Sequence, residues 1–149
     1  MKFSTREDVE APIDRVFAAV SDFDAFERRM LRRGVDITRD ETIPVDHEGA
    51  RWKAKLNWRG RDFDFDAVLL SLKPGEGYTI KSLTNGIDCM GAVDLVALSK
   101  SRTRMFVSID LKPTTLSARL FVQSLRLAKS NLTHRFKQRI GEFAAGIPG

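Results

Sequence analysis

The stretch RWKAKLNWRGRDFDFDAVL, residues 51–69, alternates apolar and charged side chains on both sides of Arg59-Gly60. A period of two predicts β-strands with one buried face, because successive side chains of a strand point to opposite sides. A two-residue turn at Arg59-Gly60 pairs Lys55 with Asp64 and Lys53 with Asp66 on one face. A slip of one residue would set lysines against phenylalanines, so the sequence predicts an antiparallel hairpin in this register.

Further strands extend this sheet toward the C-terminus. Asn85-Gly86 is typical of a type I′ turn, in which both central residues need positive φ, and centring a hairpin there places Ser82 opposite Cys89. Residues 103–111 alternate as the last strand, which Pro113 ends. The resulting inner face carries no charged side chain and consists of Trp52, Ala54, Leu56, Trp58, Phe63, Phe65, Ala67, Leu69, Tyr78, Ile80, Ser82, Cys89, Gly91, Val93, Leu95, Met105, Val107, Ile109 and Leu111.

The two ends of the chain read as one strand and three helices. Residues 3–10 alternate as a strand, Pro12 stands where a first short helix begins, and Asp22 or Asp24 can cap a second helix that ends at Gly34. From about residue 115 to 145 we expect one amphipathic helix, roughly 45 Å long at ~1.5 Å per residue. Its apolar stripe is Leu116, Leu120, Leu125, Ala128, Leu132, Phe136, Ile140 and Phe143.

These elements predict an α+β domain spanning residues 1–149. In this helix-grip arrangement, a curved antiparallel sheet of about seven strands surrounds the long C-terminal helix, and two short helices follow the first strand. No apolar run reaches the roughly 18 residues of a membrane span, and the first residues lack the apolar core of a signal peptide. Cys89 is the single cysteine, which excludes an intramolecular disulfide and suits a reducing compartment. We therefore expect a cytoplasmic protein.

The net charge of +5 is concentrated in the C-terminal helix. Between residues 116 and 145 there are six basic residues and one acidic residue, enough to account for the whole excess. A second basic cluster spans Arg28 to Arg33, where nearby acidic residues offset it. Charge on a helix face usually marks its solvated side, and no nucleic-acid motif accompanies it, so we expect no nucleic-acid partner. Contact with an anionic membrane surface stays open.

The entry into the two short helices carries a family resemblance. Val9-Glu10-Ala11-Pro12-Ile13-Asp14-Arg15-Val16-Phe17, followed by Val20-Ser21-Asp22-Phe23, resembles the opening of START-like, helix-grip proteins. This superfamily includes polyketide cyclase/dehydrase-like proteins, lipid-transport proteins and the Bet v 1 allergens. Many relatives place Trp-x-Pro after the second helix, where this chain has Arg28 to Arg33. The resemblance implies a hydrophobic molecule held between the concave sheet and the terminal helix, and catalysis in a minority of members.

The sequence offers no evident catalytic centre. General acid–base chemistry needs a titratable group near the substrate, and the predicted inner face provides none in the ordinary range. Cys89 has no reason to lie near His47 or His134, so it is neither an activated nucleophile nor part of a metal site. Asp62, Asp64 and Asp66 face outward beside lysines. We expect no catalytic residue, no metal and no cofactor.

The leading hypothesis is therefore intracellular binding of a hydrophobic small molecule or lipid, with binding favoured over catalysis. The aromatic inner wall fits either a lined pocket or simple core packing. One alternative is a cyclase/dehydratase-type enzyme that uses Tyr78 with Glu7 or Arg39 at the cavity mouth, and another is a protein that binds partners through its basic surface. The sequence leaves the ligand's identity and the oligomeric state open. The predicted ligand-binding residues are Trp52, Leu56, Trp58, Phe63, Phe65, Tyr78, Ile80, Ser82, Cys89, Gly91, Met105, Val107, Leu132 and Phe136.

Overall fold

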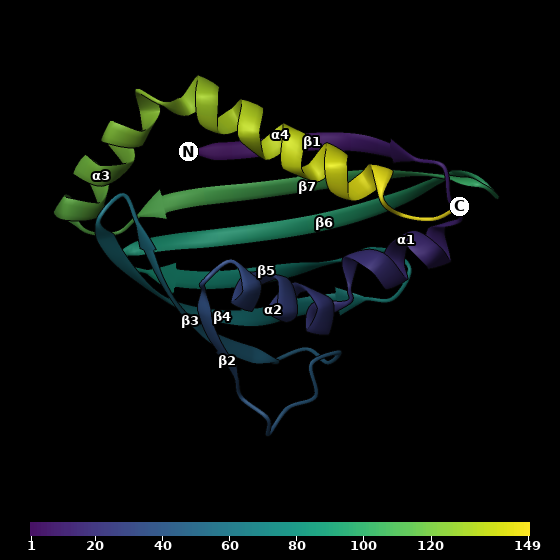
Figure 1. Ribbon diagram of the computed structural model, residues 1–149, viewed down its shortest axis with the longest axis horizontal. Coiled ribbons are helices and arrows are strands. Elements are labelled where there is room, and N and C mark those ends of the chain that lie inside the picture. The colour runs from purple at the N-terminus through teal and green to yellow at the C-terminus, as the bar shows by residue number, and fades with distance from the viewer.

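A computed structural model describes residues 1–149 and contains one seven-stranded antiparallel sheet with four helices (Figure 1). The strand order is β1-β7-β6-β5-β4-β3-β2, so only β1 and β7 are neighbours across a long connection. The elements are β1 (Lys2–Val9), α1 (Ile13–Val20), α2 (Phe23–Arg32), β2 (Asp36–Arg39), β3 (Arg51–Trp58), β4 (Arg61–Lys73), β5 (Gly77–Thr84), β6 (Ile87–Ser99), β7 (Arg102–Pro113), α3 (Leu116–Arg126) and α4 (Lys129–Ala145).

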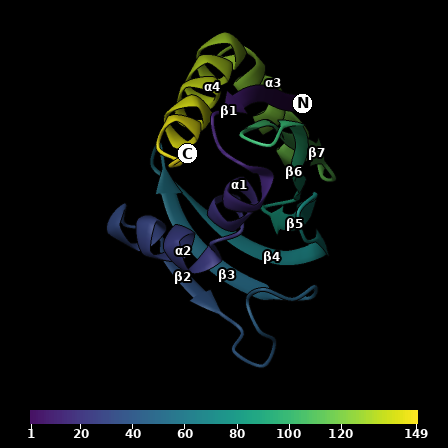
Figure 2. The ribbon, with the colours of Figure 1, turned by 90° about the vertical axis from the view of Figure 1, so that its right-hand side faces the viewer.

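The sheet curves around the helices, which all lie toward its concave side (Figure 2). Helix α4 packs along β1 at one edge, α2 packs near β2 at the other edge, and α1 lies between them against β6 and β7. None of the four helices combines the length and the apolar character needed to cross a bilayer. The predicted helix-grip architecture is confirmed.

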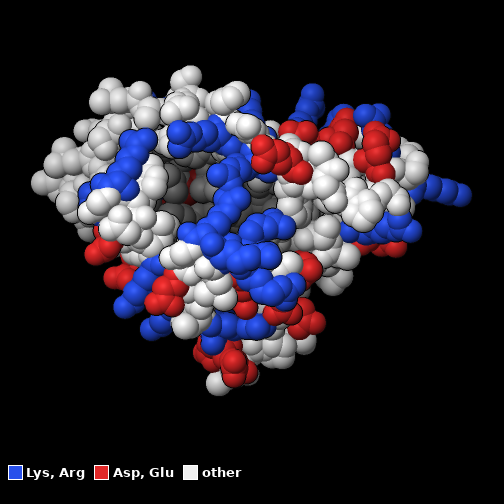
Figure 3. All heavy atoms as spheres, in the orientation of Figure 1, with Lys and Arg blue, Asp and Glu red and all other residues white.

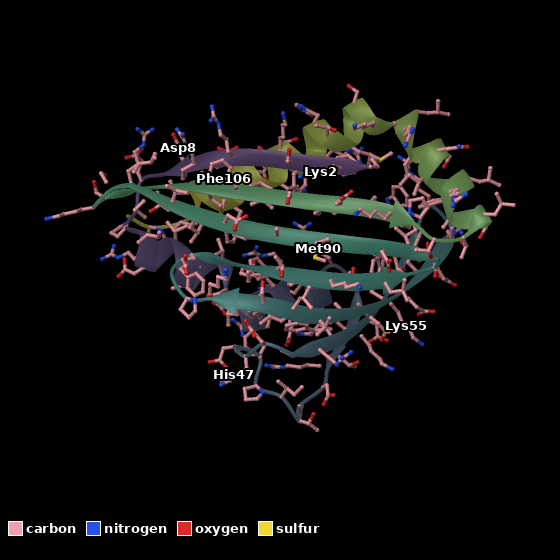
Figure 4. All side chains as sticks on the ribbon, turned by 180° about the vertical axis from the view of Figure 1, so that it is seen from behind. Lys2, Asp8, His47, Lys55, Met90 and Phe106 are labelled. Atoms are coloured by element: carbon pink, nitrogen blue, oxygen red, sulfur yellow. The ribbon has the colours of Figure 1, made fainter.

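The predicted strand registers are confirmed. Lys55 pairs with Asp64 and Lys53 with Asp66, and Ser82 lies opposite Cys89. Both turns place two consecutive residues at positive φ, with Asn85 at 45° and Gly86 at 77° in the second. Alternation therefore sorts the side chains as expected, and Figure 4 shows Lys55, Met90 and Phe106 on the convex side.

The predicted single C-terminal helix is wrong, because the chain breaks it into α3 and α4. The backbone tightens at the break, where the N–H groups of Leu127 and Ala128 bond to carbonyls three residues back. Helix α3 buries Ala118 and Val122 against Ile87 at the start of β6, whereas α4 lies along β1, and one straight rod could not follow both surfaces. The side chain of Leu127 at the break is 93 % exposed.

The break also changes which residues of α3 are buried. Leu116 and Leu120, which were expected in the buried stripe, are 74 % and 60 % exposed. Leu125 is buried as expected, and Ala118 and Val122 take the inner face in place of Leu116 and Leu120. Thr115 starts α3 as a cap, accepting a hydrogen bond from the Ala118 N–H at 3.1 Å.

The apolar interior is divided into three packed clusters rather than one continuous core. One joins β1, α1, β6 and β7 with Ala144 of α4, a second surrounds Trp52 under α2, and the third lies beneath α3. Only 21 of the 149 residues are buried. Much of the apolar inner surface therefore remains accessible, which is the condition for an internal cavity.

Leu69 provides the test of this packing. Its side chain is completely buried beside Phe23 and Trp52, whereas Leu83 on the convex face is 50 % exposed. Leu69→Ala should lower the free energy of unfolding by about 2–5 kcal/mol, because it leaves a cavity in a packed cluster. Leu83→Ala should change it by no more than about 0.5 kcal/mol. Urea unfolding of the two variants measures both values, and equal midpoints would contradict the assigned faces.

Candidate ligand cavity

A cavity of about 810 Å³ opens between α2 and α4 above the sheet. Twelve of its 19 lining residues are hydrophobic. Figure 3 shows the corresponding hollow in the face of the molecule, with arginine and lysine side chains crossing its mouth. The strands supply its floor with Tyr78, Val93, Met105 and Val107.

Tyr78 is the polar residue of this floor. Its hydroxyl donates a 2.6 Å hydrogen bond to the carbonyl of Val20, the last residue of α1. The ring of Phe23 stands edge-on to the Tyr78 ring at a centroid distance of 5.1 Å. Burial raises the pKa of Tyr78 well above its ordinary value, so the phenol stays neutral and its oxygen can still accept a hydrogen bond.

Two aromatic rings meet at the mouth of the cavity. Phe26 of α2 and Phe143 of α4 have ring centroids 5.6 Å apart. The guanidinium of Arg29 lies over both, 5.5 Å from the centre of Phe26 and 5.7 Å from that of Phe143. This cation–π stack connects the two helices that form the walls. Phe143 belongs to the predicted apolar stripe of the C-terminal helix, but neither Phe26 nor Phe143 is among the predicted site residues.

Glu7 introduces a charge that the predicted inner face lacked. The β1–β7 register pairs Glu7 with Met105, so both side chains lie on the same, concave face. The Glu7 carboxylate reaches α4 at Gly141, where a Cβ atom would stand 3.3 Å from Oε1, and it forms no ion pair. The expectation of an inner face free of charge is therefore wrong. The alternation of Phe3, Glu7 and Val9 carries this signal, but the predicted inner face covers only residues 52–111 and leaves the first strand out.

Three of the predicted site residues line the cavity, and the others lie elsewhere on the sheet and on α4. Tyr78, Met105 and Val107 line the cavity. Trp52 packs against Phe23 at 5.6 Å and donates from Nε1 to Glu27 at 2.6 Å beneath α2. The remaining predicted residues do not line the cavity, and their role in ligand binding stays a prediction: Leu56, Trp58, Phe63, Phe65, Ile80, Ser82, Cys89, Gly91, Leu132 and Phe136.

Much of the aromatic wall packs against helices. Phe63 lies 5.5 Å from the ring of Phe121 in α3, and Trp58 stands edge-on to the same ring at 6.3 Å. Phe136 packs on Phe3 of β1 at 6.2 Å. Core packing, one of the two interpretations left open by the sequence, therefore describes this end of the sheet.

Cys89 is half-buried, and burial raises the pKa of its thiol, which disfavours the nucleophilic thiolate.

No family model and no curated protein matches this chain. Solved structures do resemble it: the Zhui aromatase/cyclase from Streptomyces sp. R1128 has a TM-score of 0.61 at 14 % identity, covering 87 % of this chain and 86 % of the other. Truncated norcoclaurine synthase from Thalictrum flavum has a TM-score of 0.64 at 11 % identity, with 84 % and 82 % covered. Ara h 8.0201 has a TM-score of 0.57 at 13 % identity, with 86 % and 91 % covered. The chain thus has the helix-grip fold of START-like and Bet v 1-like proteins.

Tyr78 is the only tyrosine, so its titration can be followed directly. Tyrosinate absorbance in the ultraviolet should remain absent at pH values near 10, the ordinary pKa of the phenol, and appear only as the protein unfolds. Folding favours the neutral phenol, so its stabilising contribution is complete below that pH and is lost as the pH rises toward the raised pKa. Tyrosinate forming near pH 10 in the folded protein would contradict the buried Tyr78–Val20 contact, and Tyr78→Phe provides the blank.

Proposed function

We propose that this protein binds a hydrophobic small molecule or lipid in the cavity between α2, α4 and the sheet. The observation that carries the proposal is the largely apolar lining of a cavity of about 810 Å³. Pockets for small molecules typically have volumes of about 300–1,000 Å³, with mostly apolar walls and a few polar groups that orient the ligand. Binding is favoured because it removes the ligand's apolar surface from water, at about 25 cal/mol per Å².

The one polar group of the floor, the Tyr78 hydroxyl, suits orientation of a ligand. Tyr78 already uses its proton in the bond to Val20, so toward a ligand its oxygen acts as an acceptor. Residues with aliphatic or thioether side chains, such as Met105 and Val107, surround it. The fold neighbours support a small-molecule role, because one is an aromatase/cyclase and a norcoclaurine synthase mutant was solved with a transition-state analogue.

Ala19 and Ala18 offer a matched test of the cavity. Ala19 lines it, whereas Ala18 is an exposed neighbour on the same helix. The neutral apolar dye N-phenylnaphthylamine should bind the wild-type protein saturably with enhanced fluorescence. Ala19→Trp should weaken this binding about tenfold or more, which is about 1.4 kcal/mol, because the indole occupies part of the cavity. Ala18→Trp should bind as wild type does.

Absence of saturable dye binding to the wild type would contradict the proposal. The basic outer surface would then be the remaining candidate for function, as a surface for an acidic partner. Equal binding by the two tryptophan variants would place the dye somewhere other than this cavity.

A second candidate, an enzyme of the cyclase/dehydratase type, is favoured by one observation, the inward position of Glu7. Glu7 is not among the residues that line the cavity, but its carboxylate on the concave face forms no ion pair, and such a group can act as a general base if it reaches the proton that it abstracts. Arg39, the other group considered at the mouth, is engaged by Asp24 at 3.0 Å and by Glu27 at 3.3 Å. Tyr78 is committed to Val20. Glu7 is therefore the residue on which this candidate depends.

Proton exchange tests this candidate without knowledge of the substrate. In heavy water, a base that removes a proton from the carbon beside the carbonyl of tetralone, an apolar aryl ketone, returns a deuteron to the same carbon. The wild type should accelerate this exchange and Glu7→Gln should abolish the acceleration, as measured by proton NMR. If the wild type gives only the buffer rate while apolar dyes bind, the enzymatic candidate fails and the binding function stands.

A further inference from the structure

Three arginines from two helices converge on the mouth of the cavity. Arg29 and Arg33 come from the C-terminal end of α2 and Arg139 from α4, and all three belong to the cavity lining. None of them forms an ion pair with an acidic side chain. In Figure 3 the basic side chains form a continuous band across the hollow, between the part of the surface over α4 and the part over α2.

Arg29 is held in place while its hydrogen-bond donors stay available. The Cζ atom of its guanidinium lies over the rings of Phe26 and Phe143, 5.5 and 5.7 Å from their centres. The arginine side chains that donate hydrogen bonds within the chain are Arg15, Arg102 and Arg104, so the N–H donors of Arg29 stay available. An arginine held over aromatic rings in this way can bind a carboxylate or a phosphate through two parallel hydrogen bonds.

The acidic residues at the same mouth, Asp22 and Glu142, form no ion pair with the three arginines, and three positive against two negative side chains leave the lining with a net charge of +1. Asp22 is used as the cap of α2 and accepts from the Ala25 N–H at 3.1 Å. Glu142 accepts from the side-chain amide of Gln138 at 3.4 Å. Arginines at the end of α2 also complement its helix dipole, but that explanation does not apply to Arg139, which lies within α4.

From this arrangement we infer that the ligand is an amphipathic anion. Its carboxylate or phosphate group binds Arg29, Arg33 and Arg139 at the mouth, and its apolar body enters the cavity toward Tyr78 and Val107. This inference rests on the apolar binding proposed above and adds the chemical class of the ligand. It also gives a role to part of the basic cluster of residues 28–33, which the fold itself does not require.

Two dyes that share one apolar body separate the inference from the function on which it rests. Anilinonaphthalene sulfonate carries an anionic group that neutral N-phenylnaphthylamine lacks. The wild type should bind the sulfonate about tenfold more tightly or better. The triple variant Arg29→Gln, Arg33→Gln, Arg139→Gln should lose this preference, so that its affinities for the two dyes differ by no more than about twofold.

A matched variant controls for the overall positive field of the protein. Arg28→Gln, Arg32→Gln, Arg135→Gln removes the same number of charges from exposed arginines that do not line the cavity. It should retain the preference for the sulfonate. Loss of the preference in both triple variants, or in neither, would overturn the inference, while saturable binding of the neutral dye would leave the proposed function intact.

Competition identifies where the anionic group comes from. Oleate and dodecyl phosphate, which join an anionic group to an apolar chain, should displace both dyes from the wild type. Inorganic phosphate at the same concentration should displace neither. If inorganic phosphate displaces the sulfonate dye while oleate does not, the arginines form a site for a free anion and the amphipathic ligand is wrong.

Discussion

The arrangement of the helices over the sheet depends on the hydrogen bond from the Tyr78 hydroxyl to the Val20 carbonyl, 2.6 Å long. The carbonyl groups of the last helical turn have no partner within the helix, and a buried phenol must also satisfy its hydroxyl. One bond meets both needs and fixes the junction of α1 and α2 to β5. With Phe23 edge-on against the Tyr78 ring, α2 is anchored at its first residue while its later turns extend over the cavity.

This anchoring explains why the interior is hollow. The start of α2 packs on Trp52 and Leu69, and the end of α4 packs on Val9 and Met105 through Ala144. Between these two clusters the helices meet through the rings of Phe26 and Phe143, under Arg29, rather than by filling the space with large side chains. The same contact that spans the gap therefore brings an arginine to the mouth of the cavity.

The sheet could be predicted from the sequence because strand pairing depends on the residue pattern of each strand and of the turn that joins it to its neighbour. Alternation and turn residues place Lys55 opposite Asp64 and Ser82 opposite Cys89, and each strand needs only its neighbour to settle the register. The break at Leu127 could not be predicted, since neither Gly nor Pro marks it and it results from the different directions of the surfaces beneath α3 and α4. The position of the cavity likewise depends on how the helices pack over the sheet, and residue patterns do not specify the orientation of the helices relative to the strands. Glu7 differs from these cases, because the alternation of β1 already placed it inside.

The central claim is that an apolar molecule enters the space above Tyr78. Methyl NMR of the protein titrated with N-phenylnaphthylamine tests it most directly, because it reports where the molecule sits. The account predicts saturable shifts for the methyl groups of Met105, Val107 and Ile140, which line the cavity, and none for Val96 or Leu98 on exposed parts of β6. Shifts at the exposed methyl groups alone, or no shifts at any of these positions, would contradict it.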